Sequence, residues 1–244
     1  LERETYLGAM QRLIQVVPET GSTNADLAAR VREGEPLVEG FWLVADRQTG
    51  GRGRQGRTWE GGEGNFMGST LVRVGEGDPP SPTLAFVASL AVMQALRPYC
   101  DGLRLKWPND LLLDGGKLAG ILLEVAGDAV VIGIGANLAS PPPVTDRPAA
   151  SLPKPLDRDL FAEELARCFA DQLQQWRIYG VESLLARWSA SAHTVGEMLT
   201  VHEPGGRLLS GTYFGLDSDG ALLLRLADGT VSAIHAGDVM IQGQ

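Results

Sequence analysis

The spacing of apolar and polar residues in the first part of the chain predicts strands and helices separated by polar turns. Apolar runs at residues 41–45 and 65–74 predict two strands, and a loop rich in arginine and glycine joins them. A longer apolar run at residues 83–96, closed by Pro98, predicts a helix buried on most of its surface. Residues 5–17 mix the two patterns and predict neither element. The two strands should anchor both ends of the loop and leave its middle free to move.

A polar cap and a glycine stop predict another helix at residues 25–33. Ser22, Thr23 and Asn24 precede this segment, and Gly34 follows it. Capping alone explains Ser22 and Thr23 most simply. Hydroxyl and free N–H groups at the start of a helix can also bind a polar ligand, so both roles stay open.

Residues 103–135 alternate in the manner of neighbouring antiparallel strands. The predicted strands are residues 103–107, 111–113, 117–125 and 129–135. A turn at residues 114–116 joins the second of these strands to the third. Because no helix alternates with these strands, a Rossmann arrangement is not expected.

The pattern changes in the last third of the chain. Residues 140–155 hold six prolines and predict a surface loop, after which helices are predicted at about 157–179 and 181–191. Short strands follow at residues 198–202, 208–214, 221–226 and 230–235. These strands predict a compact all-β module that resembles a small SH3-like barrel. We therefore expect two domains, residues 1–195 and 196–244.

The composition is that of a globular protein outside the membrane and the secretory route. The chain has 244 residues, 44% of them hydrophobic and 21% charged, with a formal net charge of -9. No apolar run is long enough to cross a bilayer, and the charged start lacks the apolar core of a signal peptide. Cys100 and Cys168 form no metal spacing and are most simply core residues, which indicates a reducing, cytoplasmic location. The acidic balance argues against a protein that coats nucleic acid.

Residues 45–59 reverse this acidic average. Arg47, Arg52, Arg54 and Arg57 fall within eleven residues and are interleaved with four glycines. Glycine lets backbone N–H groups approach an anion, and guanidinium groups suit phosphate and carboxylate. The loop is expected either to close over an anionic small molecule or to be a solvated basic surface.

Lysine is scarce, and histidine lies away from the basic loop. The lysines are Lys106, Lys117 and Lys154. The histidines are His193, His202 and His235, far in sequence from the polar cap at residues 22–24 and from the basic loop. No Walker phosphate loop occurs, and the glycines at residues 51–56 do not open a helix, which excludes a dinucleotide motif. The chemistry expected is charge stabilisation by arginine and lysine rather than acid–base catalysis by histidine.

Five motifs together resemble the biotin protein ligases of the bacterial type. They are ETGSTN at residues 19–24, QTGGRGRQGRTW at 48–59, KWPND at 106–110, KLAGILLE at 117–124 and GIGAN at 133–137. Their order and spacing are similar to those of the family, and the terminal β module resembles the family's small C-terminal domain. The resemblance implies an α+β fold: a mixed, mostly antiparallel sheet with flanking helices, as in class II synthetases, followed by an SH3-like barrel.

The resemblance also implies a two-step reaction. Biotin and ATP give biotinyl-5′-AMP and pyrophosphate, and a lysine of a biotin carboxyl carrier protein domain, as in acetyl-CoA carboxylase, then attacks the mixed anhydride. Mg²⁺ would carry part of the charge of the leaving pyrophosphate. Because the adenylate is hydrolysed by water, an ordered loop should also exclude solvent.

The site residues follow from the same resemblance. Those of the biotin site are Ser22, Thr23, Asn24, Gln48, Arg52, Gly53, Arg54, Lys117 and Gly120. Those of the nucleotide site are Arg54, Arg57, Trp59, Asn109, Lys117 and Asn137. Arg52, Arg54 and Lys117 are expected to be catalytic because they offset the repulsion between the biotin carboxylate and the α-phosphate.

Some of these residue types are equally typical of structural roles. Trp59 and Trp107 also suit a core, and Glu124 suits a hydrogen-bonded carboxylate at the end of a strand. Asp110 is the candidate metal ligand, but an aspartate in a β-turn explains it as well, and other metal ligands are unknown.

Two other functions compete with biotin ligation. A lipoate or octanoate ligase would need a longer apolar channel and would lack the arginine-rich string. A non-catalytic biotin-binding regulator would not need to neutralise a reacting phosphate. About eighteen residues precede the first motif, too few for a winged helix, so a ligase without DNA binding is expected. Exposed strands of the meander are candidates for pairing in a homodimer.

Overall fold

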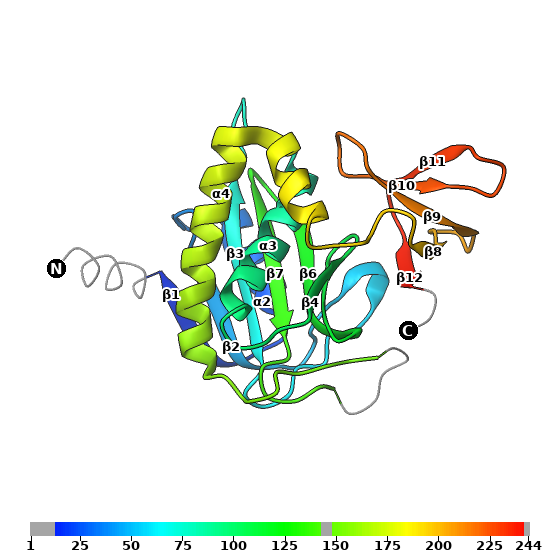
Figure 1. Ribbon diagram of the computed structural model, residues 1–244. Helices are drawn as coiled ribbons and strands as arrows, with labels where there is room; N and C mark the ends of the chain where they lie inside the picture. Colours follow the sequence, from blue (N-terminus) through cyan, green and yellow to red (C-terminus); the bar gives the residue numbers. More distant parts are fainter. Residues whose placement is uncertain (1–12, 143–147, 242–244) are drawn as a thin grey trace.

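Two β-sheets organise the chain in the computed structural model, which describes residues 13–142 and 148–241 (Figure 1). The larger sheet has seven strands in the order β1-β2-β3-β7-β6-β5-β4, and the smaller has five in the order β11-β10-β9-β8-β12. Helices flank the larger sheet, so the expected mixed sheet followed by an all-β module is confirmed. The domain boundary expected at residue 196 falls between the last helix and β8, and its place stays a prediction.

The strands of the larger sheet are β1 (Ile14–Thr20), β2 (Trp42–Gln48), β3 (Phe66–Arg73), β4 (Leu103–Lys106), β5 (Asp110–Leu113), β6 (Gly116–Ala126) and β7 (Ala129–Ala136). Six of them match predicted strands, and all pair antiparallel except β1 with β2. Helix α2 (Thr23–Arg32) connects this parallel pair and makes one βαβ unit. The pattern of the sequence did not predict this unit. Strand β1 runs through Pro18, because an edge strand tolerates a missing N–H.

The two faces of the larger sheet are covered unequally (Figure 1). Helices α3 (Leu84–Leu96) and α4 (Arg158–Ser189) pack on one face over the main core, where Trp42 and Phe66 contact α4 aromatics edge to face. Helix α2 covers the opposite face with a much smaller apolar cluster that includes Leu27. Part of that second face therefore remains open beside the start of α2.

Helix α4 contains the break that the sequence predicted. Gly180 adopts φ 71° and ψ −171°, which separates the two expected helical segments within one continuous element. At its start, one carboxylate oxygen of Asp157 accepts the backbone N–H groups of Asp159 and Leu160 and so caps the helix. Within the parts that the structure describes, no helix combines the length and the apolar character needed to span a bilayer.

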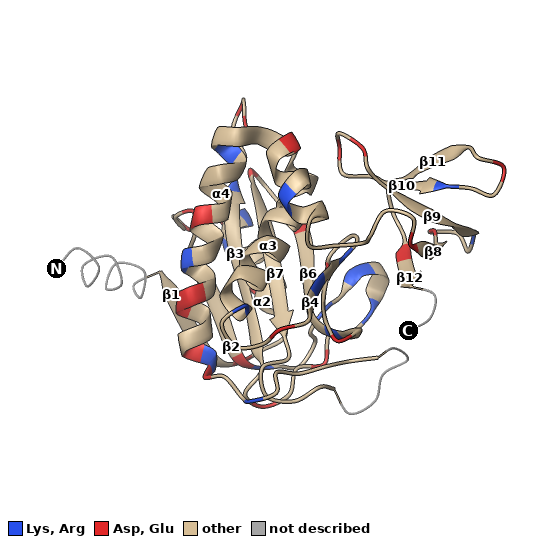
Figure 2. Cartoon of the chain, in the orientation of Figure 1, with Lys and Arg blue, Asp and Glu red and all other residues tan. Residues whose placement is uncertain are grey.

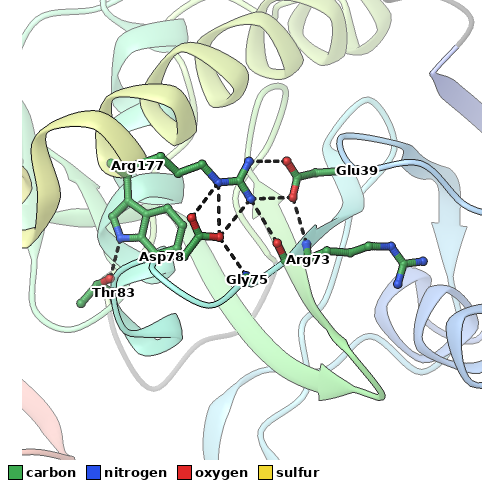
Figure 3. Close-up of polar contacts among 7 residues, drawn as sticks. Glu39, Arg73, Gly75, Asp78, Thr83 and Arg177 are labelled. Atoms are coloured by element: carbon green, nitrogen blue, oxygen red, sulfur yellow. Dashed lines mark hydrogen bonds and ion pairs between the residues drawn. The ribbon is translucent and has the colours of Figure 1, made fainter.

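Arg177 ties α4 to the loops that flank β2 and β3 (Figure 3). Its Nη1 donates to Glu39 at 2.5 Å, its Nε to Asp78 at 3.2 Å, and its Nη2 to the carbonyl of Arg73 at 3.1 Å. The hydrogen bond that Arg177 donates to Glu39 raises the pKa of Arg177 above its ordinary value. One guanidinium group thus connects the long helix to both ends of the β2–β3 region.

The C-terminal module comprises β8 (Met198–His202), β9 (Leu208–Leu216), β10 (Leu222–Arg225), β11 (Val231–Ile234) and β12 (Asp238–Ile241). The first four match predicted strands, whereas β12 was not predicted. The buried residues of the module, such as Leu199 and Tyr213, belong to the same apolar cluster as the main core. The indole N–H of Trp107 also donates to the carbonyl of Gly220 at 3.0 Å. The module is therefore packed against the segment that carries the KWPND motif.

Candidate active site

A cleft of about 730 Å³, a volume that includes the open space at its mouth, lies on the α2 face of the larger sheet. The N-terminus of α2, strands β6 and β7, and the loop between β2 and β3 surround it. Its lining includes every residue expected at the biotin site, as well as Asp110 and every residue expected at the nucleotide site except Asn137. Segments separated by as many as about two hundred residues in sequence therefore meet around one cavity, although the role of each residue stays a prediction.

Glycines make the floor of this cleft. Gly120 on β6 pairs with Gly135 on β7, and Gly133 lies two residues earlier on β7. A Cβ atom at Gly133 would approach Oδ1 of Asn24 to 2.5 Å, and one at Gly135 would approach the indole of Trp59 to 2.2 Å. The GIGAN motif therefore leaves space for the side chains that stand above the sheet.

Polar groups at the start of α2 form the closed end of the cleft. Ser22 is the N-cap, and its hydroxyl accepts the N–H of Ala25 at 3.4 Å. The backbone N–H of Thr23 donates to Oε1 of Gln48 at 2.7 Å, and its hydroxyl lies 2.7 Å from that of Ser69. Ser22 and Thr23 thus combine capping with a place in the cleft.

Asn24 extends this network deeper into the sheet. It is 3% exposed, and its Oδ1 accepts the hydroxyl of Ser69 at 2.8 Å while its Nδ2 donates to Glu124 at 2.7 Å. The sequence did not predict Ser69, although a serine inside the apolar strand β3 was a visible signal. Every polar atom of the Asn24 amide has a partner, which fixes its position before any ligand binds.

The basic loop forms the opposite wall, and its arginines contact three different parts of the fold. Nη1 of Arg52 lies 3.9 Å from Oε1 of Glu124 on β6, and Nη1 of Arg54 donates to Oδ1 of Asn109 at 3.0 Å. Burial lowers the pKa of Arg54, and the charge of Asp110 opposes that shift. In Figure 2 the basic residues of this loop gather between the larger sheet and the C-terminal module.

The last arginine of the loop, Arg57, reaches the C-terminal module. Arg57 forms an ion pair with Asp238 at the start of β12, and its Nη1 lies 3.3 Å from Oδ1 of that aspartate. The backbone N–H of Gly53 donates to the carbonyl of Arg57 at 2.7 Å, so the loop folds back on itself. Asp238 was not predicted, because no local pattern connects residues 181 positions apart.

Lys117 reaches the cleft from the start of β6. Its Nζ lies 2.6 Å from Oδ1 of Asp110, and Nζ of Lys106 lies 3.6 Å from Oδ2 of the same carboxylate. The Lys117 ammonium also lies 5.7 Å from the ring centre of Trp59, within the range of a cation–π contact. Lys117 and the loop arginines therefore bring positive charge to the same cavity from two separate segments.

Two asparagines support the elements around the cleft. Nδ2 of Asn109 donates to the carbonyl of Ile121 at 2.6 Å, which ties the KWPND turn to β6. Nδ2 of Asn137 donates to the carbonyls of Lys117 and Ala150, at 3.2 and 3.0 Å. Asn137 is thus placed behind Lys117 rather than in the cleft lining, and its Oδ1 lacks a partner among the described residues.

Comparison with known proteins identifies the family. The family model described as "Biotin/lipoate A/B protein ligase family" matches residues 18–137, and that for the "Biotin protein ligase C terminal domain" matches residues 194–241. A biotin–[acetyl-CoA-carboxylase] ligase of Mycobacterium tuberculosis is 39% identical over 252 residues, covering 98% of this chain and 93% of the relative. The chain belongs to the biotin protein ligases.

Further comparisons extend this assignment to both sheets of the ligase. A biotin–[acetyl-CoA-carboxylase] ligase of Paracoccus denitrificans is 37% identical over 245 residues, covering 93% of this chain and all of the relative. A solved biotin protein ligase from Aquifex aeolicus, in complex with biotin and ATP, has 25% identity and a TM-score of 0.80. That match covers 94% of this chain and 98% of the solved one, so the family resemblance of the motifs is confirmed.

Proposed function

We propose that the cleft is where this ligase joins biotin to ATP and holds biotinyl-5′-AMP for transfer to a carrier lysine. The observation that carries the proposal is the meeting of Arg52, Arg54 and Lys117 around one cavity whose other end is lined by hydrogen-bonded hydroxyl and amide groups. Biotin is complementary to this cavity, because it carries a neutral ureido ring at one end and a carboxylate at the other. The relatives and the solved structure described above support the activity.

The closed end suits the ureido ring of biotin. This ring offers a carbonyl and two N–H groups, and the hydroxyls of Ser22 and Thr23 and the amide of Gln48 provide partners of both kinds. The network is held in place by the fold, so binding the ring requires little reordering of side chains.

The open end suits the acyl phosphate. A carboxylate oxygen of biotin attacks the α-phosphorus of ATP, the bond to the bridging oxygen breaks, and pyrophosphate leaves with its electron pair. Arg52, Arg54 and Lys117 would offset the repulsion between the two anions and stabilise the charge of the displacement. The amine of the carrier lysine then attacks the acyl carbon and expels AMP, forming an amide.

The adenosine has a place beyond Lys117. The indole N–H of Trp59 and Oδ1 of Asn137 are buried and have no hydrogen-bond partner among the described residues. Two backbone carbonyls hold Nδ2 of Asn137, which keeps its Oδ1 oriented as an acceptor. Such groups can satisfy a purine or a ribose, and Asn109 and Arg57 complete the expected nucleotide set.

The contacts of Asp110 do not favour its expected role as a metal ligand. One carboxylate oxygen faces Lys117 and the other faces Lys106, so two positive charges already surround it. Within residues 13–142 and 148–241, no group of three or more His, Cys, Asp and Glu side chains gathers to hold an ion. Two lysines therefore neutralise Asp110, and the ligands of Mg²⁺ stay unassigned.

The expected partner is a biotin carboxyl carrier domain, and two relatives are named for acetyl-CoA carboxylase. Homodimer formation, the absence of DNA binding and a cytoplasmic location stay predictions. In support of a dimer, β5 pairs with β6 only as far as Gly120, so the rest of β6 has a strand neighbour on one side among the described strands. Sedimentation velocity with and without biotin tests the dimer.

A labelling assay tests the activity. The purified chain should attach biotin to the lysine of a carrier domain only when ATP is present, with AMP and pyrophosphate as products. Lipoate and octanoate under the same conditions should give no labelling. Labelling by either acid would favour the competing ligase function, and biotin binding without pyrophosphate release would favour the non-catalytic regulator.

A further inference from the structure

Glu124 contacts both ends of the site although it does not belong to the cleft lining. It lies near the end of β6 and is half-buried. Its Oε2 accepts a hydrogen bond from Nδ2 of Asn24 at 2.7 Å, and its Oε1 lies 3.9 Å from Nη1 of Arg52. One oxygen thus contacts the closed end, and the other faces the basic loop.

An ionised carboxylate only accepts hydrogen bonds, so Glu124 sets the direction of the hydrogen bonds beyond it. Asn24 must turn its Nδ2 toward Glu124, which turns its Oδ1 toward the hydroxyl of Ser69, 2.8 Å away. Because Ser69 has a single proton and donates it to Asn24, it can only accept from the hydroxyl of Thr23 at 2.7 Å.

The direction of these hydrogen bonds also decides which donor and acceptor atoms are left to bind a ligand. The single proton of the Thr23 hydroxyl has two acceptors in reach, Ser69 at 2.7 Å and Oε1 of Gln48 at 3.1 Å. Because Ser69 already donates to Asn24, the shorter contact requires Thr23 to donate to Ser69, and the Thr23 oxygen remains as an acceptor. Oε1 of Gln48 is occupied by the backbone N–H of Thr23 at 2.7 Å, so its Nε2 remains as a donor. An acceptor and a donor side by side complement the N–H and the carbonyl of a ureido ring.

We propose that Glu124 is a positioning residue that sets the donor and acceptor order at the closed end and tethers Arg52 above the same cleft. This inference rests on the proposed function, because it assigns the ureido ring to the closed end. The charge of Glu124 is the property that matters, because a neutral amide of the same shape could point its donor or its acceptor toward Asn24.

The variant E124Q tests both halves of the inference. Its network loses a fixed direction, so the dissociation constant of biotin, measured by calorimetry without ATP, should rise about tenfold. Arg52 loses its counter-charge, so release of biotinyl-5′-AMP in a single-turnover assay should accelerate by about threefold. Added salt should accelerate release from both proteins and reduce the difference between them, because it screens the pair between Arg52 and Glu124 that only the wild type has. E63Q, which removes an exposed glutamate in the neighbouring loop, is the matched control and should change neither quantity.

A second variant moves the charge instead of removing it. In N24D/E124Q, the carboxylate at position 24 accepts from both Ser69 and the amide at position 124, which restores the direction of the network. N24D alone places two carboxylates face to face. The double variant should therefore bind biotin at least about fivefold more tightly than N24D.

Three results would overturn the inference. The first is E124Q with the dissociation constant and release rate of the wild type. The second is a change confined to a lower Tm, which indicates a purely structural role. The third is N24D/E124Q binding biotin no better than N24D. Absence of biotin labelling by the wild-type chain would instead refute the proposed function, and the two failures are distinguishable.

Discussion

The closed end of the cleft and the basic loop hold their polar groups in opposite ways. Asn24 is 3% exposed and bonded on both sides of its amide, whereas the side chain of Arg52 is 59% exposed and its nearest carboxylate is 3.9 Å away. Buried hydrogen bonds are insensitive to salt and fix a geometry, while exposed ion pairs are weak and break readily. The ligase thus combines a preformed pocket for a neutral group with a loop that can exchange protein partners for a bound anion.

The largest effect is expected from Lys117→Ala, because Lys117 lies where the closed end and the basic loop meet. Removing this ammonium group should lower adenylation by about 10²–10³-fold, because no other group replaces its charge at the reacting phosphate. Isotopic exchange between pyrophosphate and ATP measures the effect, and Tm should change little. Lys154→Ala, an exposed lysine in the proline-rich segment, should behave as wild type. Normal exchange in Lys117→Ala would refute the role of this lysine.

Gly133→Ala tests the preformed end by itself. The added methyl group would lie 2.5 Å from Oδ1 of Asn24, so the amide must move and its network must reorganise. Biotin affinity should fall by about 10–100-fold, as measured by calorimetry. At Gly75 the nearest atom to a new Cβ is 3.9 Å away, and Gly75→Ala serves as the control. Equal affinities for the two variants would show that the closed end is not rigid.

Asp238→Asn tests the loop by itself, from the C-terminal module. Loss of the ion pair with Arg57 should loosen the loop and accelerate escape of biotinyl-5′-AMP by about two- to fivefold. The binding of biotin without ATP should not change, because the closed end has no contact with this pair. Glu203→Gln removes a carboxylate of the same module that pairs with Arg207 at 3.6 Å, and should leave release unchanged. Identical release rates in both variants would exclude a role for the module in holding the loop.

The last effect is on stability rather than on the ligand, and it concerns pH and the support behind the KWPND turn. Nε2 of His193 accepts the backbone N–H of Trp107 at 3.3 Å, and burial lowers the pKa of His193 to about 4 from an ordinary 6.5. Between these values the unfolded chain binds the extra proton, so stability should fall as pH falls from 6.5 toward 4. The loss should be about 1–2 kcal/mol at pH 5, measured by urea unfolding, and smaller in His193→Gln. Equal pH dependence in both proteins would contradict this assignment.

Local patterns predicted most elements of the fold, and the reasons for the exceptions are physical. The polar cap before α2, the alternation of β6 and the glycine break in α4 are each decided by neighbouring residues, and each was predicted. Strand β1 was not, because it is held by its pairing with β2, some twenty-eight residues away. Strand β12 was likewise missed, since four residues pair with β8 across the module.

The candidate site divides in the same way. The motifs identified which side chains suit the chemistry, and the fold brings all but Asn137 to one cleft lining. Ser69 and Asp238 were missed, and Glu124 was interpreted as a local carboxylate, because their partners lie 45, 181 and 100 residues away in sequence. Contacts over such separations leave no periodic trace along the chain.

The sequence by itself determined the family, the type of most elements and the chemical character of the site, since propensity, capping and short motifs depend on adjacent residues. Only the tertiary structure decided which charges meet. Arg52, Arg54 and Arg57 are two or three residues apart, yet they contact β6, the KWPND turn and the C-terminal module. Their separate partners arise from the way two sheets and one loop pack together, a property that exists only once the chain has folded.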